Sequence, residues 1–242
     1  MIMKKLFILI LVFTGSQSFA QPWKTINGDG NVKKESRTVA DFNSLSSHGA
    51  INVTISYGNS NSIQVEADDN LLPYIETNVE NGKLIIQTKK NVNLRTRRKI
   101  IVSVSMIKIN ALQLSGSGNI DGNGSFTADE ETKIMLSGSG NIHLTSGTFK
   151  NLNLAISGSG NILVKGGSAN SVLVAVSGSG NADCSGITAD QADVKISGSG
   201  NAKVNVSKSL TANISGSGNV YYKGNATDIS TRIIGSGKAI KI

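Results

Sequence analysis

The sequence Ser115-Gly-Ser-Gly-Asn119 recurs six times along the chain and decides the fold. The copies start at Ser115, Ser137, Ser157, Ser177, Ser197 and Ser215, and a degenerate seventh copy, Gly235-Ser-Gly-Lys238, follows them. The steps between the six copies are 22, 20, 20, 20 and 18 residues. A period close to 20 residues is typical of a solenoid, in which one repeat cannot bury its own apolar face and successive coils must stack.

Residues on both sides of this repeated sequence alternate between apolar and variable positions. The residue before the first serine is apolar in every copy: Leu114, Leu136, Ile156, Val176, Ile196, Ile214 and, in the seventh copy, Ile234. The residue before that one is variable: Gln113, Met135, Ala155, Ala175, Lys195, Asn213 and Ile233. Because side chains alternate along a strand, the first set is expected to point inward and the second outward. The chain is predicted to be all-β, a solenoid whose coils of about 20 residues read strand, corner, strand.

The repeated sequence itself is predicted to be the corner. Two glycines allow a sharp bend at the same place on every coil, since glycine tolerates positive φ. With coils about 4.8 Å apart, each asparagine side chain can bond to the one above it. We therefore expect a corner ladder made of Asn119, Asn141, Asn161, Asn181, Asn201 and Asn219. The serine hydroxyls are expected to satisfy backbone groups of the corners.

Residues 1–20 read as a secretory signal peptide. Lys4 and Lys5 precede an apolar run, and a small-x-small site predicts cleavage between Ala20 and Gln21. No cysteine follows the apolar run, which excludes lipid attachment there, and no transmembrane segment is expected in the mature chain. The sequence thus predicts an exported protein, placed in the periplasm, at the outer membrane, at the cell surface or in the medium.

The rest of the chain is predicted to have three parts. Residues 21–35 are expected to be a flexible lead-in, 36–110 irregular β coils, and 111–242 the regular solenoid. Asn81-Gly82 between two apolar runs indicates a β-hairpin. Whether the irregular coils form a separate domain is left open. The basic residues in 89–99 are interpreted either as a solvated loop or as a binding site for an acidic surface.

Candidate chemistry is sparse. The dinucleotide fingerprint and the P-loop are both absent, and no nucleic acid partner is expected. Cys184, the single cysteine, is expected in the core, while His48 and His143 are too few for a metal site, so no metal or cofactor is predicted. Asp121 and Asp183 would lie three coils apart, about 14 Å, which exceeds the ~10 Å that cooperating carboxylates need. The prediction is a non-enzymatic protein, with no catalytic residue assigned.

Several segments resemble one known family, the putative autotransporter adhesins with a head GIN domain, found in exported proteins, many from Bacteroidetes. The similarity lies in 37–45 (Arg-Thr-Val-Ala-Asp-Phe-Asn-Ser-Leu), 49–55 (Gly-Ala-Ile-Asn-Val-Thr-Ile), 78–86 (Asn-Val-Glu-Asn-Gly-Lys-Leu-Ile-Ile) and the recurring Gly-Ser-Gly-Asn-Ile. It covers about 36–238. The resemblance implies a right-handed, parallel β-helix-like fold and a cell-surface binding role, and it brings no catalytic residues.

The function expected from the sequence is therefore an exported β-solenoid that acts as an adhesin or binds glycans or other cell-envelope components. The variable outward positions, among them Asn213, Lys195, Tyr221, Lys203 and His143, are the expected binding surface. Two alternatives stay open. One is a polysaccharide lyase or glycoside hydrolase on the same scaffold, using Asp121 or Asp183. The other is a structural envelope protein that self-associates through its exposed coil ends.

Overall fold

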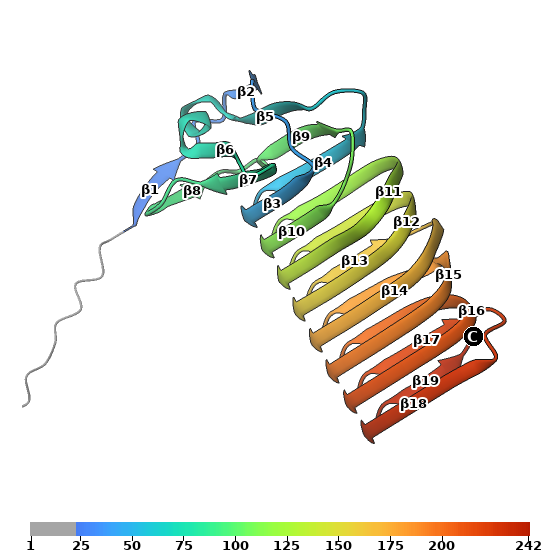
Figure 1. The fold of residues 1–242 in the computed structure, drawn as a ribbon. Helices are drawn as coiled ribbons and strands as arrows, with labels where there is room; N and C mark the ends of the chain where they lie inside the picture. The colour runs from blue at the N-terminus through green and yellow to red at the C-terminus, as the bar shows by residue number, and fades with distance from the viewer. Residues whose placement is uncertain (1–22) are drawn as a thin grey trace, which may run out of the picture.

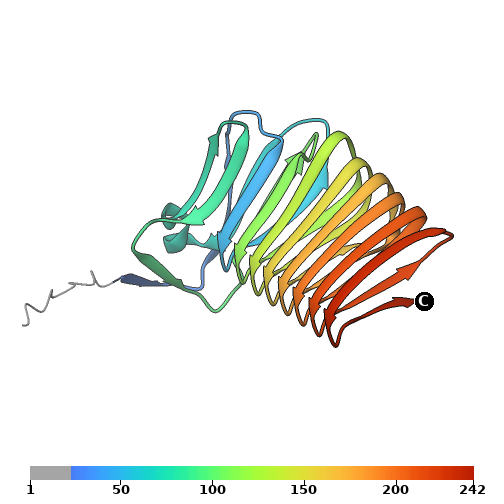
Figure 2. The ribbon, with the colours of Figure 1, turned by 60° about the horizontal axis from the view of Figure 1, so that its bottom comes forward.

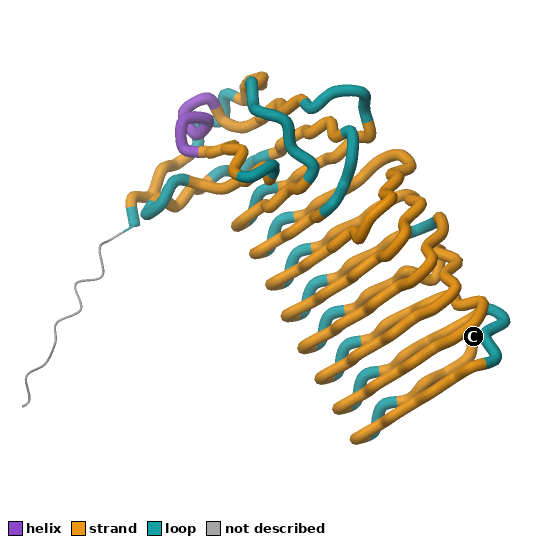
Figure 3. The backbone as a smooth tube through the Cα atoms, viewed as in Figure 1, coloured by secondary structure: helices purple, strands orange, loops and turns teal. Residues whose placement is uncertain are grey.

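The computed structural model describes residues 23–242 and shows an all-β solenoid, as the repeat predicted. Figure 1 shows the coils stacked in a row, with the irregular strands at one end of the stack and the C-terminus at the other. The predicted signal peptide, with its cleavage position Ala20/Gln21, lies outside the described residues. Within the described range, the one helix is the short 3₁₀ helix η1, and no helix is long and apolar enough to cross a membrane (Figure 3).

The regular part of the solenoid consists of parallel strands that pair one coil with the next. These strands are β10 (Ala111–Gly116), β11 (Asn119–Gly138), β12 (Asn141–Gly158), β13 (Asn161–Val164), β14 (Gly167–Gly178), β15 (Asn181–Gly198), β16 (Asn201–Gly216), β17 (Asn219–Lys223), β18 (Asp228–Gly235) and β19 (Lys238–Lys241). Ser115 is in register with Ser137, and Asn119 with Asn141, so equivalent positions of the repeat lie directly above one another. Figure 2 shows this stacking from a second direction.

The interior of the solenoid is formed by the predicted inward positions. Leu114, Val174 and Val194 are completely buried, and so are the residues that follow the asparagines, such as Ile120 and Ile142. Because the whole strand repeats in register, each inward side chain packs on its equivalent in the neighbouring coils. The core is therefore a set of apolar columns parallel to the solenoid axis.

The seventh copy of the repeat sits one residue away from the predicted alignment. Gly235 pairs with Gly216, which places Ile233 opposite Ile214 and Arg232 opposite Asn213. The prediction that Ile234 points inward is wrong, because it occupies the position of the first serine and is 60% exposed. Gly235 sets this register, since it has the positive φ that the corner requires there. Arg232 is consequently an outward residue of the last coil.

All the irregular strands except β1 and β8 belong to the same continuous sheet as the solenoid. The irregular strands are β1 (Lys24–Asn27), β2 (Val32–Arg37), β3 (Ser44–Gly49), β4 (Asn52–Tyr57), β5 (Ser62–Asp68), β6 (Ile75–Glu80), β7 (Lys83–Thr88), β8 (Val92–Arg95) and β9 (Ile101–Met106), with η1 (Asp69–Tyr74) between β5 and β6. Only β1 and β8 form a separate, two-stranded sheet. β3 lies between β7 and β10, so strands distant in sequence form consecutive coils.

The expectation of a flexible lead-in at 21–35 is wrong for its described part. β1 pairs with β8 inside the basic segment, and β2 pairs antiparallel with β5. The sequence of β2 does not look like a strand because it is rich in charged residues. In the structure, Lys33 and Lys34 form ion pairs with Asp69 and Glu66 on the exposed side of this edge strand.

The N-terminal end of the stack is covered by antiparallel pairs. β6 and β7 form the predicted hairpin, with Asn81 at φ 51° and Gly82 at φ 70°, the two positive φ values of a type I′ turn. Together with η1, these strands close the end of the core that precedes β3.

Candidate functional site

The two glycines of each corner are required for different reasons. The first glycine has positive φ in all seven corners, between 115° and 134°. The second glycine does not, but a Cβ on Gly160 would lie 2.2 Å from the carbonyl oxygen of Gly140 in the preceding coil. The prediction that both glycines serve a positive φ is therefore wrong for the second, which is needed because two backbones approach closely.

Backbone bonds between coils satisfy the corners. The carbonyl oxygen of Gly138 accepts from the N–H groups of both Ser159 and Gly160, at 3.0 Å each, and the other corners repeat this arrangement. Within residues 23–242 the corner serines donate no side-chain hydrogen bond, contrary to the expected role of their hydroxyls. The first serine of each copy instead faces outward on the strand that precedes the corner.

The six predicted asparagines form a ladder. Each amide donates to the Oδ1 atom of the asparagine one coil earlier, over 2.8–3.2 Å, through Asn119, Asn141, Asn161, Asn181, Asn201 and Asn219. The ladder begins one coil earlier than the repeat, at Asn52, which accepts from Asn119. At the other end of the ladder, Oδ1 of Asn219 accepts a hydrogen bond from the backbone N–H of Lys238. Because these amides satisfy one another, the ladder holds the coils in register.

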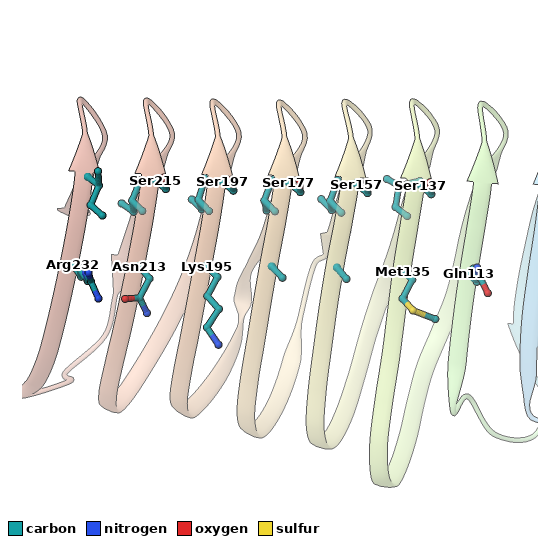
Figure 4. Close-up of a pocket in the computed structure, with 18 residues that line it drawn as sticks. Gln113, Met135, Ser137, Ser157, Ser177, Lys195, Ser197, Asn213, Ser215 and Arg232 are labelled. Atoms are coloured by element: carbon teal, nitrogen blue, oxygen red, sulfur yellow. The ribbon is translucent and has the colours of Figure 1, made fainter.

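A long shallow groove of about 660 Å³ runs along the outer face of the strands that precede the corners. Figure 4 shows its two rows of side chains, which cross the coils one after another. One row is the outward column: Gln113, Met135, Ala155, Ala175, Lys195, Asn213 and Arg232. The other row consists of the corner serines and their replacement in the last coil: Ser137, Ser157, Ser177, Ser197, Ser215 and Ile234.

The composition of the strands explains the groove. Ala155 and Ala175 are the smallest residues of the outward column, and they lie between the longer side chains of Met135 and Lys195. The serines beside them are equally short. The surface is therefore hollow where neighbouring coils carry only methyl and hydroxymethyl groups.

Two cationic side chains lie at the C-terminal end of the groove. Lys195 Nζ is 3.3 Å from Asp193 Oδ2, a mostly exposed ion pair on the same strand. Arg232 forms no ion pair or side-chain hydrogen bond within residues 23–242. Asn213 lies between these two residues in the column. The groove is thus apolar in its middle and positively charged at one end.

The structure separates the predicted surface residues into two groups. Lys195 and Asn213 line the groove, whereas His143, Lys203 and Tyr221 lie beyond the corner on the next strand. His143 Nδ1 is 3.2 Å from Asp121 Oδ1, and Lys203 pairs with Asp183 at 3.4 Å. The sequence pattern does not reveal Arg232 or the serine row, because the seventh copy has Ile234 in place of the first serine and because the repeated sequence predicts that the serines lie in corners.

The residues weighed for other chemistry lie apart. Three register steps separate Asp121 from Asp183, through His143 and Leu163. His48 Nε2 is 3.0 Å from Ser46 Oγ, and no group of three or more metal-ligating side chains exists in the described part of the chain. Cys184 is buried as predicted, and this burial raises the pKa of its thiol to about 12.

The basic segment lines a second, more polar hollow of about 660 Å³. Arg95, Arg97 and Arg98 lie there beside Asp68, which is buried and accepts a hydrogen bond from the Thr96 hydroxyl at 2.9 Å. The segment is therefore partly structured by β8 rather than being a plain loop.

Comparison with solved structures finds the same fold in proteins of Bacteroides and Parabacteroides. A protein described as a "putative adhesin" from Bacteroides fragilis superimposes with a TM-score of 0.83 at 22% identity, over 90% of this chain and 100% of its own. A "putative lipid binding protein" from Parabacteroides distasonis gives 0.71 at 28% identity, over 90% and 100%. A "putative adhesin" from the same organism gives 0.71 at 27% identity, again over 90% and 100%.

No curated protein matches this sequence. A family model does, and it aligns with residues 41–226, which include most of the irregular coils and all six copies of the repeated sequence. Since this match covers well over half of the chain, the protein belongs to the family described as "Putative auto-transporter adhesin, head GIN domain".

Proposed function

We propose that the chain is an exported, non-enzymatic adhesin that binds envelope components or glycans through the groove between the outward column and the serine row. The observation that carries this proposal is the continuity of the groove, which extends from Gln113 to Arg232 across seven coils. A surface built from repeated coils makes many weak contacts with an extended ligand, and together these give useful affinity.

Other observations support the proposal. Asp121 and Asp183 lie three coils apart, too far for two carboxylates that act together on one glycosidic bond. Each of them is also paired with its own basic neighbour. Both observations disfavour the glycosidase alternative. The family name and the two Parabacteroides descriptions, adhesin and lipid-binding protein, both suit a ligand found at a cell envelope. Export itself rests on residues 1–20.

The test uses the mature chain, residues 21–242, on glycan arrays and on isolated bacterial envelopes. The variant Ala155→Gln/Ala175→Gln fills the hollow with uncharged side chains, and it should weaken binding at least ~10-fold, the equivalent of ~1.4 kcal/mol. Asn170→Gln places the same side chain at an exposed site outside the groove and should bind normally. A mature chain that binds neither glycans nor envelopes contradicts the proposal, as does binding that is insensitive to the double variant.

Self-association is a second candidate, and the last coil favours it. Ile229 and Ile233 are about 40% exposed on β18, in positions that other coils bury. Edge strands with apolar side chains pair readily with another chain. Light scattering of the mature chain should show dimers that Ile229→Lys dissociates. A strict monomer at high concentration would exclude this candidate.

A further inference from the structure

The groove changes character along the solenoid axis. From Met135 to Ala175 the outward column is apolar, and from Lys195 to Arg232 it is polar and cationic. Each half covers two register steps, about 10 Å at the spacing of neighbouring strands. A ligand lying along the axis would therefore meet an apolar surface first and two positive charges afterwards.

The apolar half is aliphatic. Its surface comes from Met135, Ala155 and Ala175 and from the serine β-carbons, and none of the residues that line the groove is aromatic. Sugars are commonly bound by stacking on aromatic rings, which this surface lacks. An alkyl chain needs only apolar surface, because each methylene group removed from water favours binding.

The hollow is narrow as well as aliphatic. On β14, Leu173, Ala175 and Ser177 alternate on the outer face, and Leu173 is the larger neighbour of the alanine. On β12, Asn153, Ala155 and Ser157 repeat the arrangement. The depression is therefore two short side chains wide, the alanine and the serine of each coil, and Asn153 and Leu173 bound it on one side.

The cationic half complements an anionic head group. The guanidinium of Arg232 has no partner within residues 23–242, and its planar fork suits a carboxylate with two parallel hydrogen bonds. Lys195 is engaged only by Asp193, in an exposed contact that a ligand can share. The Asn213 amide between them can donate to the same group.

We propose that the groove binds a single-chain anionic amphiphile, a long-chain fatty acid, with its alkyl chain over Ala155 and Ala175 and its carboxylate at Lys195 and Arg232. This inference rests on the proposed function, because it takes the groove to be the ligand site. It replaces a general envelope component by one chemical class.

The experiment measures displacement of a dansyl-labelled fatty acid from the mature chain by palmitate. Palmitate should compete, and hexadecanol, which has the same chain without the charge, should compete at least ~10-fold more weakly. In Lys195→Gln/Arg232→Gln the palmitate affinity should fall to that of hexadecanol, while the hexadecanol affinity stays unchanged. Ala155→Gln/Ala175→Gln should weaken both. Lys203→Gln removes one positive charge outside the groove and should change neither.

The outcomes separate this inference from the proposed function. If palmitate fails to bind while envelope binding still depends on Ala155 and Ala175, the fatty-acid inference is overturned and the adhesin proposal stands. Selective binding of an acidic glycan in the groove also overturns it, and so does a palmitate affinity that Lys195→Gln/Arg232→Gln leaves unchanged. If neither palmitate nor envelopes bind, both proposals fail.

Discussion

The side-chain amide of Asn141 donates a hydrogen bond to Oδ1 of Asn119 at 2.9 Å, across the gap between two coils. Asn141 also accepts from Asn161 at 3.0 Å, so each asparagine inside the ladder is donor and acceptor at once. An amide is the side chain that offers both functions in one plane. The ladder is therefore directional, and a residue that only accepts interrupts it.

Replacing Asn161 by aspartate tests this directionality. An ionised carboxylate cannot donate to Asn141 Oδ1, and it places negative charge against that oxygen. We expect Asn161→Asp to lower the free energy of unfolding at pH 7 by about 1–3 kcal/mol. Protonation restores a donor, so the folded state raises the pKa of the new carboxyl group. The destabilisation should be present at neutral pH and lost as the pH falls through that raised pKa. Urea titrations at several pH values measure it.

Asn170→Asp is the matched control, because Asn170 is exposed and makes no side-chain hydrogen bond in the described part of the chain. Its free energy of unfolding should change by less than about 0.5 kcal/mol. Equal effects of the two variants would mean that the ladder contributes nothing specific.

The second corner glycine gives a steric prediction. In Gly160→Ala the new Cβ would lie 2.2 Å from the Gly140 carbonyl oxygen and 2.7 Å from Leu136, so two coils must move apart. We expect a loss of about 3 kcal/mol or more in stability. Gly166→Ala should be tolerated, because its Cβ meets nothing nearer than 3.8 Å and its φ is not positive. Thermal melts of both variants decide the matter, and a stable Gly160→Ala protein would contradict the close approach.

The solenoid could be predicted because each repeat is defined by residue types that lie close together in the sequence. Glycine pairs mark corners and alternating apolar residues mark strands, so Leu114 and Asn119 could be placed without knowing any long-range contact. The same reasoning placed Cys184 in the core. Each of these predictions needs only the period of the sequence.

The parts that could not be predicted depend on contacts between distant segments. His48-Gly-Ala-Ile-Asn52 forms a corner in register with Ser115-Gly-Ser-Gly-Asn119, but Ile51 stands where the later corners have glycine. Its resemblance to the repeat is visible only after superposition. The groove was likewise hidden, because hollowness depends on Ala155 and Ala175 being smaller than residues in neighbouring coils.

The buried thiol gives a prediction about reactivity. Burial raises the pKa of Cys184 from an ordinary value of 9.0 to about 12, and its Sγ donates to the Lys203 carbonyl oxygen. Since the thiolate is the reactive form, a disulfide reagent at pH 8 should leave the native protein unmodified and react with one thiol after denaturation. Asn170→Cys in a Cys184→Ala background should react at once. Because the folded-state pKa is raised, the neutral thiol stabilises the fold below pH 9 and loses that contribution as the pH rises toward 12.

The pairing of β3 with β10 leads to the last prediction. Leu45 is opposite Leu112, both are buried, and β3 bonds β7 on its other side. A chain that starts at residue 107 would expose the whole edge of β10 together with Leu112 and Leu114, and exposed apolar edge strands associate. We therefore expect light scattering to show larger oligomers or aggregates for the fragment 107–242 than for the mature chain, in which β3 covers this edge. A monomeric, cooperatively folded 107–242 would instead show that the irregular coils are a domain of their own, joined to a solenoid that needs no cover.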